Sequence, residues 1–393
     1  MAASPETCSS GTELEDRANL GGRPTIGAYA LWTAFPAAAA VAALTVACGH
    51  GAVVGADPKF APCREIVALD GGPAPEVRWF GPGQDDEIVR HFQWCRATGP
   101  LLVTRPDRAG GQPTDGLPID SLAIISFNVN LGAASAIALI DSLRAGAFTA
   151  GAPVTDFVVM LQETIREGNG VPERVPKGSG TSRDLFPAPR TGPRLDIVRI
   201  ADSLDLHLFY GAAMRSGKGR NPRGLAEDRG NAILSTLPLA RLTMVELPFG
   251  GARRIAQLAQ VSGRTRSGQG WSLQVGNLHF DVGPIGPSAL SAIRARQARA
   301  IAQIADSTGA VVLGGDLNAF SLRGTAESVK ILQRAFPETV QGDSLPTRGS
   351  QRLDYLFFRL PAGYGTGPYR ALPLDFGSDH RPVMGWVRFE VGR

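Results

Sequence analysis

Residues 311–318 read VVLGGDLN, and this stretch decides how the rest of the chain is interpreted. The apolar run at its start predicts a buried strand. Gly314 and Gly315 then permit close backbone approach, and Asp316 and Asn318 follow two positions apart. Both side chains can reach one reacting centre, where Asp316 orients or helps deprotonate a water and Asn318 donates to a charged oxygen. An ordinary turn with side-chain hydrogen bonds is the alternative.

Other apolar runs of the chain also end in a polar side chain. The runs IISF, VVMLQ and VGNL are followed by Asn128, Glu163 and His279. Side chains at strand ends project into one rim of a sheet, where loops on a rigid scaffold form binding and catalytic sites. Asn128 and Glu163 supply the oxygen ligands that suit Mg²⁺ or Mn²⁺, and His279 is expected to contact a phosphate oxygen. Each of these residues alone is more often an ordinary polar residue at a strand end.

The loop SDHRP at residues 378–382 precedes the last predicted strand. His380 is the candidate general base, because its side chain titrates nearest neutral pH. A base of this kind needs an orienting carboxylate, and the run RLDYL offers Asp354. Asp379 then remains available to a metal ion.

From Ser121 onward, short β-rich runs alternate with helical patterns, which predicts a layered α/β domain with buried sheets. The predicted strands are residues 122–128, 157–162, 232–235, 272–278, 310–313, 353–358 and 383–391. The predicted helices are residues 134–145, 195–206, 289–307 and 325–336.

In chain order, these strand ends resemble the endonuclease/exonuclease/phosphatase superfamily, which has the DNase I-like fold. The resemblance spans roughly Ser121 to the C-terminus, and its specificity comes from a set of short motifs. These are Asn128, Glu163, GNAILS at 230–235, NLHFD at 277–281, GDLN at 315–318, LDY at 353–355 and SDH at 378–380. The resemblance implies a four-layered α/β sandwich, in which two packed mixed β-sheets are flanked by helices.

The resemblance also implies divalent-metal-dependent phosphoester hydrolysis, with in-line attack of an activated water on phosphorus. It assigns three residues to the Mg²⁺ or Mn²⁺ ion, namely Glu163 as the principal ligand, Asn128 and Asp379. It assigns catalytic roles to His380, oriented by Asp354, to Asp316 and Asn318, which position the nucleophile, and to His279 on the scissile phosphate. Which of these groups is the base stays open.

Residues from about 29 to 47 form an Ala-rich apolar run that is followed at once by Cys48. The run has the shape of an export signal, and LTVAC at residues 44–48 resembles a bacterial lipoprotein processing site. An uncleaved membrane anchor is the main alternative, and a buried helix of a soluble domain is another. We therefore expect residues 1–48 to be a signal, lipoprotein or anchor segment. The protein is expected to be exported, either attached to a membrane or periplasmic or extracellular.

Residues 49–118 are rich in Gly, Pro and Asp, and are expected to form a linker and a small N-terminal extension such as a hairpin or short sandwich. The catalytic domain is expected to follow at residues 119–393. In an oxidising compartment Cys63 and Cys95 are able to pair, and two unrelated buried thiols are the alternative.

The first substrate hypothesis is a nuclease, although a net charge of +4 favours a polyanionic partner only weakly. The stretch from Arg166 to Arg229 is expected to overhang the site. Its cationic side chains would follow a nucleic-acid backbone, and these are Arg215, Lys218, Arg220, Arg223 and Arg229. Phe209 and Tyr210 offer rings for base stacking.

The second hypothesis is a lipid-headgroup or small-molecule phosphodiesterase or phosphatase, similar to a sphingomyelinase or an inositol phosphatase. A non-catalytic binding protein on the same fold is disfavoured, because none of the central residues Glu163, Asp316, Asp379 and His380 is missing. The expected partners are a phosphoester substrate, nucleic acid among the candidates, and a membrane. No protein partner is expected, and the chain is expected to be a monomer.

Overall fold

The computed structural model describes residues 64–82, 84–104, 118–168, 170–180, 194–216, 224–282, 286–320 and 324–389. All of these belong to one compact unit, residues 49–393. The segment predicted as a signal or anchor, residues 1–48, lies outside the described residues. Among the helices that are described, none has the length and apolar character needed to cross a membrane.

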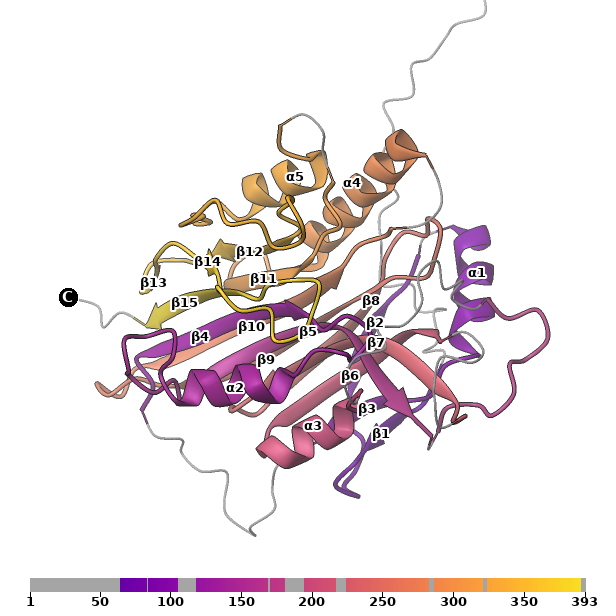
Figure 1. The fold of residues 1–393 in the computed structure, drawn as a ribbon, viewed down its shortest axis with the longest axis horizontal. Coiled ribbons are helices and arrows are strands. Elements are labelled where there is room, and N and C mark those ends of the chain that lie inside the picture. Colours follow the sequence, from indigo (N-terminus) through magenta and orange to yellow (C-terminus); the bar gives the residue numbers. More distant parts are fainter. Residues whose placement is uncertain are drawn as a thin grey trace, which may run out of the picture. The chain divides into compact units, whose positions relative to one another are not determined.

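The fold is built on two mixed β-sheets (Figure 1). The nine-stranded sheet has the order β1-β3-β6-β7-β5-β4-β15-β13, with β14 also paired to β15. Its strands are β1 (Ile66–Ala68), β3 (Leu101–Thr104), β4 (Ser121–Asn128), β5 (Phe157–Glu167), β6 (His207–Arg215), β7 (Glu227–Ser235), β13 (Tyr364–Thr366), β14 (Arg370–Ala371) and β15 (Val383–Phe389). The six-stranded sheet has the order β12-β11-β10-β9-β8-β2. Its strands are β2 (Val77–Phe80), β8 (Ala240–Glu246), β9 (Ile255–Arg264), β10 (Gly270–His279), β11 (Ala310–Asp316) and β12 (Asp354–Arg359).

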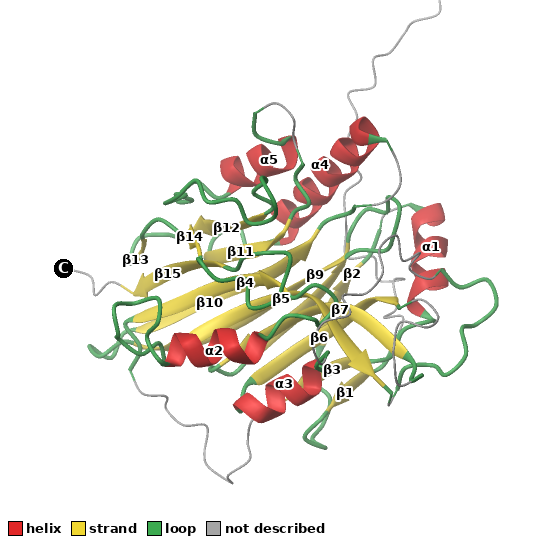
Figure 2. Cartoon of the chain, viewed as in Figure 1, coloured by secondary structure: helices red, strands yellow, loops and turns green. Residues whose placement is uncertain are grey.

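Alternating side chains along each strand separate three apolar cores. In β4, Ile124 points into a core shared with Val312 of β11, between the two sheets. The next residue, Ile125, packs on the outer face of the nine-stranded sheet, against α2 (Ala136–Arg144) and α3 (Ile197–Leu204). Val311 packs on the outer face of the six-stranded sheet, against α4 (Pro287–Ile304) and α5 (Glu327–Ala335). Each sheet therefore has one apolar face toward the other sheet and one toward helices. The result is four layers, with helices on both outer faces (Figure 2).

Side chains and proline mark where several helices begin. The Ser135 hydroxyl accepts from Ala138 N at 3.1 Å at the start of α2. The carboxylate of Asp196 accepts from Val198 N at 2.8 Å at the start of α3, and Pro287 occupies the first turn of α4. The first N–H groups of a helix have no partner within the helix. Ser135 and Asp196 accept hydrogen bonds from such groups, and Pro287 has no N–H that needs a partner.

The structure confirms the predicted layered α/β fold and contains every predicted strand and helix, with shifted ends. The largest shifts are in β5, which continues to Glu167, and in β7, which begins at Glu227. Within the predicted catalytic domain, strands β6, β8, β9, β13 and β14 were not predicted. Because α3 and β6 lie between Arg166 and Arg229, that stretch is not one overhanging loop.

The segment predicted as a linker and small extension contributes to both sheets. Strand β1 pairs in parallel with β3, which pairs with β6, while β2 pairs in parallel with β8. Helix α1 (Asp85–Cys95) lies between β2 and β3 in the chain. The strands therefore form no hairpin or sandwich of their own. Cys95 is disulfide-bonded, and its predicted pairing with Cys63 stays a prediction because Cys63 lies outside the described residues.

Candidate active site

Three predicted site residues lie side by side in the six-stranded sheet. His279 at the end of β10 is in register with Asp316 at the end of β11, and Asp316 is in register with Asp354 at the start of β12. By the alternation of each strand, all three share the face that carries Val275 and Val312 into the core between the sheets. The site is therefore the polar end of that core, and buried sheet positions fix its side chains.

Gly314 and Gly315 permit this packing, as the sequence predicts. A Cβ at Gly314 would lie 2.4 Å from Met160 Cε of the opposite sheet, and one at Gly315 would lie 2.0 Å from the Leu278 carbonyl oxygen of β10. Both contacts are far too short for real atoms, so larger residues at these positions would displace β11 and the carboxylate of Asp316 with it.

His380 and Asp354 form a hydrogen-bonded pair. The Nδ1 atom of His380 lies 2.8 Å from Asp354 Oδ2, and both side chains are buried. The loop that carries His380 is fixed on both sides: Ser378 Oγ donates to the Asn128 carbonyl at 2.7 Å, and Arg381 N donates to the Thr347 carbonyl at 2.7 Å. His380 Nε2 faces Asp316 Oδ2 at 3.8 Å and Asp379 Oδ1 at 4.0 Å. The imidazole therefore has one nitrogen bound and the other directed among carboxylates.

Glu163 enters the site through a local irregularity of β5. The pairing of β5 with β7 shifts register between Leu161 and Thr164, and Glu163 has a φ of 56°. In a regular strand the side chain after Gln162 would point to the outer face, away from the other site residues. The bulge turns Glu163 inward, so that its Oε1 lies 3.8 Å from His279 Nε2, with the side chain 26% exposed. A left-handed backbone at a non-glycine residue is a cost that functional sites often carry.

Two hydrogen bonds, one of them from the opposite sheet, fix Asp316. Asn128 Nδ2 donates to Asp316 Oδ2 at 3.0 Å, and the backbone N–H of Asn318 donates to Asp316 Oδ1 at 2.8 Å. Asn318 itself has a φ of 45°, and its Nδ2 donates to the Phe280 carbonyl at 3.1 Å. Asn318 is thus an anchor of the loop after β11 as well as a neighbour of the site.

Electrostatics divide the ionisable groups of the site into two kinds. Burial alone lowers the pKa of His380, but Asp354, Asp316 and Asp379 outweigh it and raise this pKa to about 10. Burial raises the pKa of Asp316 to about 6, against the opposing effect of His380. Burial and the charge of Arg254 lower the pKa of His279 well below its ordinary value, so its imidazole is neutral at pH 7. The site therefore pairs a cationic His380 with a neutral His279.

Arg254, which the sequence analysis missed, lies against His279. Its Nη1 atom lies 3.1 Å from His279 Nδ1 and 3.3 Å from Nε2, and the residue is 7% exposed. Arg254 directly precedes β9, which runs antiparallel to β10, so the start of β9 lies at the same rim as the end of β10. Because β9 was not among the predicted strands, the pattern of strand ends gave no signal for Arg254.

Asp316, Asp354 and His380 can place ligand atoms within 4.8 Å of one another. These three are fully buried, however, and Asp354 and His380 already bind each other. Glu163 and Asp379 are 26% and 40% exposed, and with Asn128 they provide the oxygen donors that hard divalent cations prefer. Because Mg²⁺ keeps several of its waters, the accessible carboxylates fit such an ion better than the buried cluster does.

The structure thus brings together His279, Asp316, Asn318, Asp354 and His380, with Asn128 and Glu163 beside them and Asp379 at the exposed edge. Several residues predicted to contact nucleic acid are buried or lie outside the described residues. Phe209 and Tyr210 are fully buried and cannot stack on bases. Arg215 is 7% exposed and donates to the carbonyls of Pro172 and Glu173. Lys218, Arg220 and Arg223 lie outside the described residues.

Two asparagine motifs of the sequence have a structural role. Asn277 Nδ2 donates to the carbonyls of Leu161 and Ala232 in the opposite sheet, at 2.9 and 2.8 Å, and Asn231 Nδ2 donates to the Ile255 carbonyl at 3.1 Å. These amides join the two sheets beneath the site, so they position the catalytic strands.

The model of the Endonuclease/Exonuclease/phosphatase family matches residues 125–380, more than half of the chain. The chain belongs to this family. Members of the endonuclease/exonuclease/phosphatase family are generally hydrolases that act on phosphoester bonds. The matched range begins within β4 and ends at His380, so it contains all eight predicted site residues.

Several solved structures of this superfamily are similar to the chain. An endonuclease/exonuclease/phosphatase from Beutenbergia cavernae is 19% identical, with 69% of this chain and 72% of that chain covered and a TM-score of 0.47. TDP2 from D. rerio, complexed with a single-strand DNA product, is 18% identical over 69% and 100%, with a TM-score of 0.39. Sphingomyelinase C from Streptomyces griseocarneus is 18% identical over 68% and 99%, with a TM-score of 0.37. None of the curated proteins matches the chain.

Proposed function

We propose that this family member is a divalent-metal-dependent phosphodiesterase, most simply a nuclease, which hydrolyses its substrate by in-line attack of water on phosphorus. One observation carries the proposal. The His380–Asp354 pair, Asp316, His279 and Glu163 come from separate segments of both sheets and converge at one rim, with His380 Nε2 and His279 Nε2 3.8 and 3.7 Å from the same Asp316 oxygen. A structural polar cluster has no need of so many charges at such spacing.

Asp316 is the group best placed to act on the attacking water. It is held by Asn128 and by the N–H of Asn318, and its pKa is raised to about 6 by burial. A carboxylate with that pKa is mostly ionised at pH 7 yet still able to accept a proton. His380, with its raised pKa, is a cation that can stabilise charge on the phosphoryl oxygens, and Asp354 fixes its orientation. His279 offers a neutral imidazole to the same oxygens.

Glu163, Asp379 and Asn128 are the residues that would hold a Mg²⁺ or Mn²⁺ ion. Such an ion supplies charge neutralisation of the phosphoryl oxygens and orientation of the substrate. Glu163 is held by its bulge and Asn128 by its bond to Asp316, so both are positioned in advance.

Substrate profiling tests this proposal. Purified protein is assayed with plasmid DNA, RNA, bis-p-nitrophenyl phosphate, p-nitrophenyl phosphate and sphingomyelin, each with Mg²⁺ and with EDTA. We expect diester hydrolysis that EDTA abolishes. Activity that survives EDTA would contradict the metal-dependent mechanism, and activity confined to the monoester would contradict a phosphodiesterase. Hydrolysis of sphingomyelin alone would replace the nuclease by a lipid-headgroup phosphodiesterase.

We further propose that the enzyme is exported and attached to a membrane through Cys48. The Cys48→Ser variant should leave the membrane fraction if the lipoprotein interpretation is correct. Retention of this variant in washed membranes would instead favour an uncleaved anchor.

A further inference from the structure

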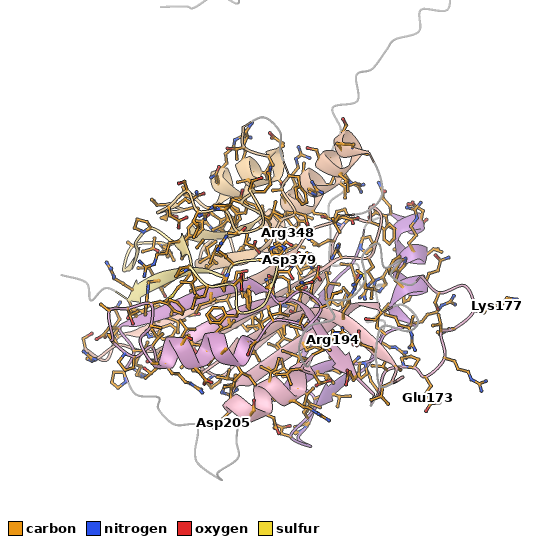
Figure 3. All side chains as sticks on the ribbon, in the orientation of Figure 1. Glu173, Lys177, Arg194, Asp205, Arg348 and Asp379 are labelled. Carbon is orange, nitrogen blue, oxygen red and sulfur yellow. The ribbon has the colours of Figure 1, made fainter. Side chains whose placement is uncertain are left out.

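Arg348 lies at the exposed edge of the active site and has no role in the mechanism above. Its Nη2 atom lies 2.7 Å from Asp379 Oδ2, and the two side chains are 35% and 40% exposed (Figure 3). Asp379 Oδ1 in turn lies 4.0 Å from His380 Nε2. Arg348 is therefore one residue away from the catalytic imidazole, on the side that faces solvent.

The backbone of Arg348 is fixed relative to the catalytic pair. Arg348 N and Gln351 O, and Gln351 N and Arg348 O, form hydrogen bonds of 2.9 and 2.8 Å across a tight turn. Thr347 Oγ1 accepts from Asp354 N at 3.1 Å, and the Thr347 carbonyl accepts from Arg381 N at 2.7 Å. The turn is thus bonded both to the strand of Asp354 and to the loop of His380. A guanidinium mounted there has a defined place beside the reacting phosphoryl group.

The side chain of Arg348, unlike that of Arg254, is accessible. Arg254 and Arg348 both contribute to lowering the pKa of His279, which places their charges near the site. Arg254 is only 7% exposed and lies against the imidazole. The ion pair of Arg348 joins two groups that are each more than one third exposed, and such pairs contribute little to stability. Exchange of the Asp379 carboxylate for a substrate anion would therefore cost little.

We propose that Arg348 is a specificity-determining residue that binds a second phosphate group of the substrate, next to the phosphoryl group that is hydrolysed. The inference rests on the proposed function and narrows its substrate class to phosphodiesters that carry a further phosphate. A guanidinium matches the two oxygens of a phosphate with two parallel hydrogen bonds, which a lysine cannot reproduce. The same charge disfavours a cationic headgroup such as phosphocholine.

A matched pair of substrates tests the proposal. Thymidine 5′-(p-nitrophenyl phosphate) has one phosphate, and its 3′-phosphorylated form differs only by the second. We expect the wild-type protein to hydrolyse the 3′-phosphorylated form with a kcat/KM at least about 10-fold higher. Arg348→Gln should reduce this ratio to near one, mainly through KM, and Arg348→Lys should retain part of it. Arg334→Gln is the matched control, because Arg334 is 73% exposed on α5, and it should leave the ratio unchanged.

Binding provides a second readout that needs no turnover. Isothermal titration in EDTA should show thymidine 3′,5′-bisphosphate binding at least about 10-fold tighter than thymidine 5′-monophosphate, and Arg348→Gln should remove the difference. If Arg348→Gln lowered kcat/KM for both substrates and the affinity for both ligands by the same factor, the proposal would be overturned, since Arg348 would then serve only to hold Asp379. An unchanged ratio in Arg348→Gln would overturn it as well. Absence of hydrolysis with the binding preference intact would count against the proposed function alone.

Discussion

Two clusters of buried charge in this protein differ in how completely they are hydrogen-bonded. In the Asp228 cluster, the carboxylate of Asp228 accepts from Arg166, from Tyr210 Oη at 2.8 Å and from Gly99 N at 2.7 Å, and Arg166 Nη1 donates to the Pro100 carbonyl at 2.8 Å. In the active-site cluster, Asp354 Oδ1 is buried and has no hydrogen-bond partner among the described residues. The contacts of His380 Nε2 with carboxylates are 3.8 and 4.0 Å long.

The completeness of hydrogen bonding distinguishes buried charges that stabilise the fold from buried charges that are available to bind a ligand. The Asp228 cluster attaches the chain between α1 and β3 to the nine-stranded sheet, and its hydrogen bonds offset the cost of burial. The active-site cluster leaves gaps of nearly 4 Å, too long for direct hydrogen bonds, at the place where a phosphoryl group would bind. Buried charges that are incompletely paired therefore mark the site more clearly than burial alone.

The largest expected effect comes from removing the imidazole of His380. We expect His380→Ala to lower kcat/KM for bis-p-nitrophenyl phosphate by about 10³-fold or more, because the phosphoryl oxygens lose their cationic partner and Asp354 loses its hydrogen bond. Steady-state kinetics with Mg²⁺ measure this change.

His207→Ala is the matched control for that experiment. His207 begins β6 and is in register with Ser235 of β7. Ser235 also pairs with Val158, at the opposite end of β5 from Glu163, so His207 lies at the end of the sheet away from the active site. Its removal should change kcat/KM less than about 2-fold, well below the range of direct acid–base effects. A comparable loss in both variants would show that the measured effect reflects folding and not catalysis.

Asp228→Asn tests whether the Asp228 cluster stabilises the fold. The isosteric change leaves Arg166 buried without its counter-charge, so we expect a loss of about 3–5 kcal/mol in the free energy of unfolding, measured by urea denaturation. Asp86→Asn, at an ion pair with Arg90 that is 50% and 64% exposed, should cost less than about 1 kcal/mol. If Asp228→Asn were as mild as Asp86→Asn, the Asp228 cluster would not be the stabilising contact described above.

The sequence predicted the active-site cluster better than the Asp228 cluster. Asp316, His279 and Asp354 end or begin predicted strands, and once β10, β11 and β12 pair in register the period of two places all three on one face. Glu163 was predicted to be in the site, but its bulge was not, since a register shift depends on the partner strand β7. Arg348 was missed because nothing in the run TRGSQ shows that its turn is bonded to the loop of His380.

Long-range pairing explains most of the fold that was not predicted. Strands β1 to β3 are three or four residues long, and β2 pairs with β8 across more than 160 positions of sequence. Strand β9 reads IAQLAQVSGR and has no regular alternation of apolar and polar residues. Its Gln257 is buried, and the amide of this residue donates to the Phe209 carbonyl at 3.1 Å. Such strands are stabilised by their partners, which composition cannot reveal.

Asp316→Asn should stabilise the protein, in contrast to Asp228→Asn. Burial raises the pKa of Asp316 from 3.8 to about 6, so the folded state binds a proton more tightly than the unfolded state. The stability of the protonated form is fully present below about pH 3.8 and is lost as pH rises through 6. At pH 7 in EDTA, the variant should gain on the order of 2 kcal/mol in the free energy of unfolding while losing activity. A destabilised variant would show that the carboxylate is well compensated by its hydrogen bonds.

The smallest net effect is expected from a titration of opposite sign at His207, which opposes that of Asp316. Burial lowers the pKa of His207 to about 4, partly opposed by Asp205, so the folded state releases this proton more readily than the unfolded state. Its contribution to stability is present above about pH 6.5 and is lost as pH falls toward 4, the range in which protonation of Asp316 adds stability. The two effects should partly cancel in the wild-type protein. Melting temperatures in EDTA should therefore fall more steeply between pH 6.5 and 4 in Asp316→Asn, and less steeply in His207→Gln, than in the wild type. Parallel curves for all three proteins would mean that neither group dominates the acid response, and that the incomplete pairing at the site has no energetic cost.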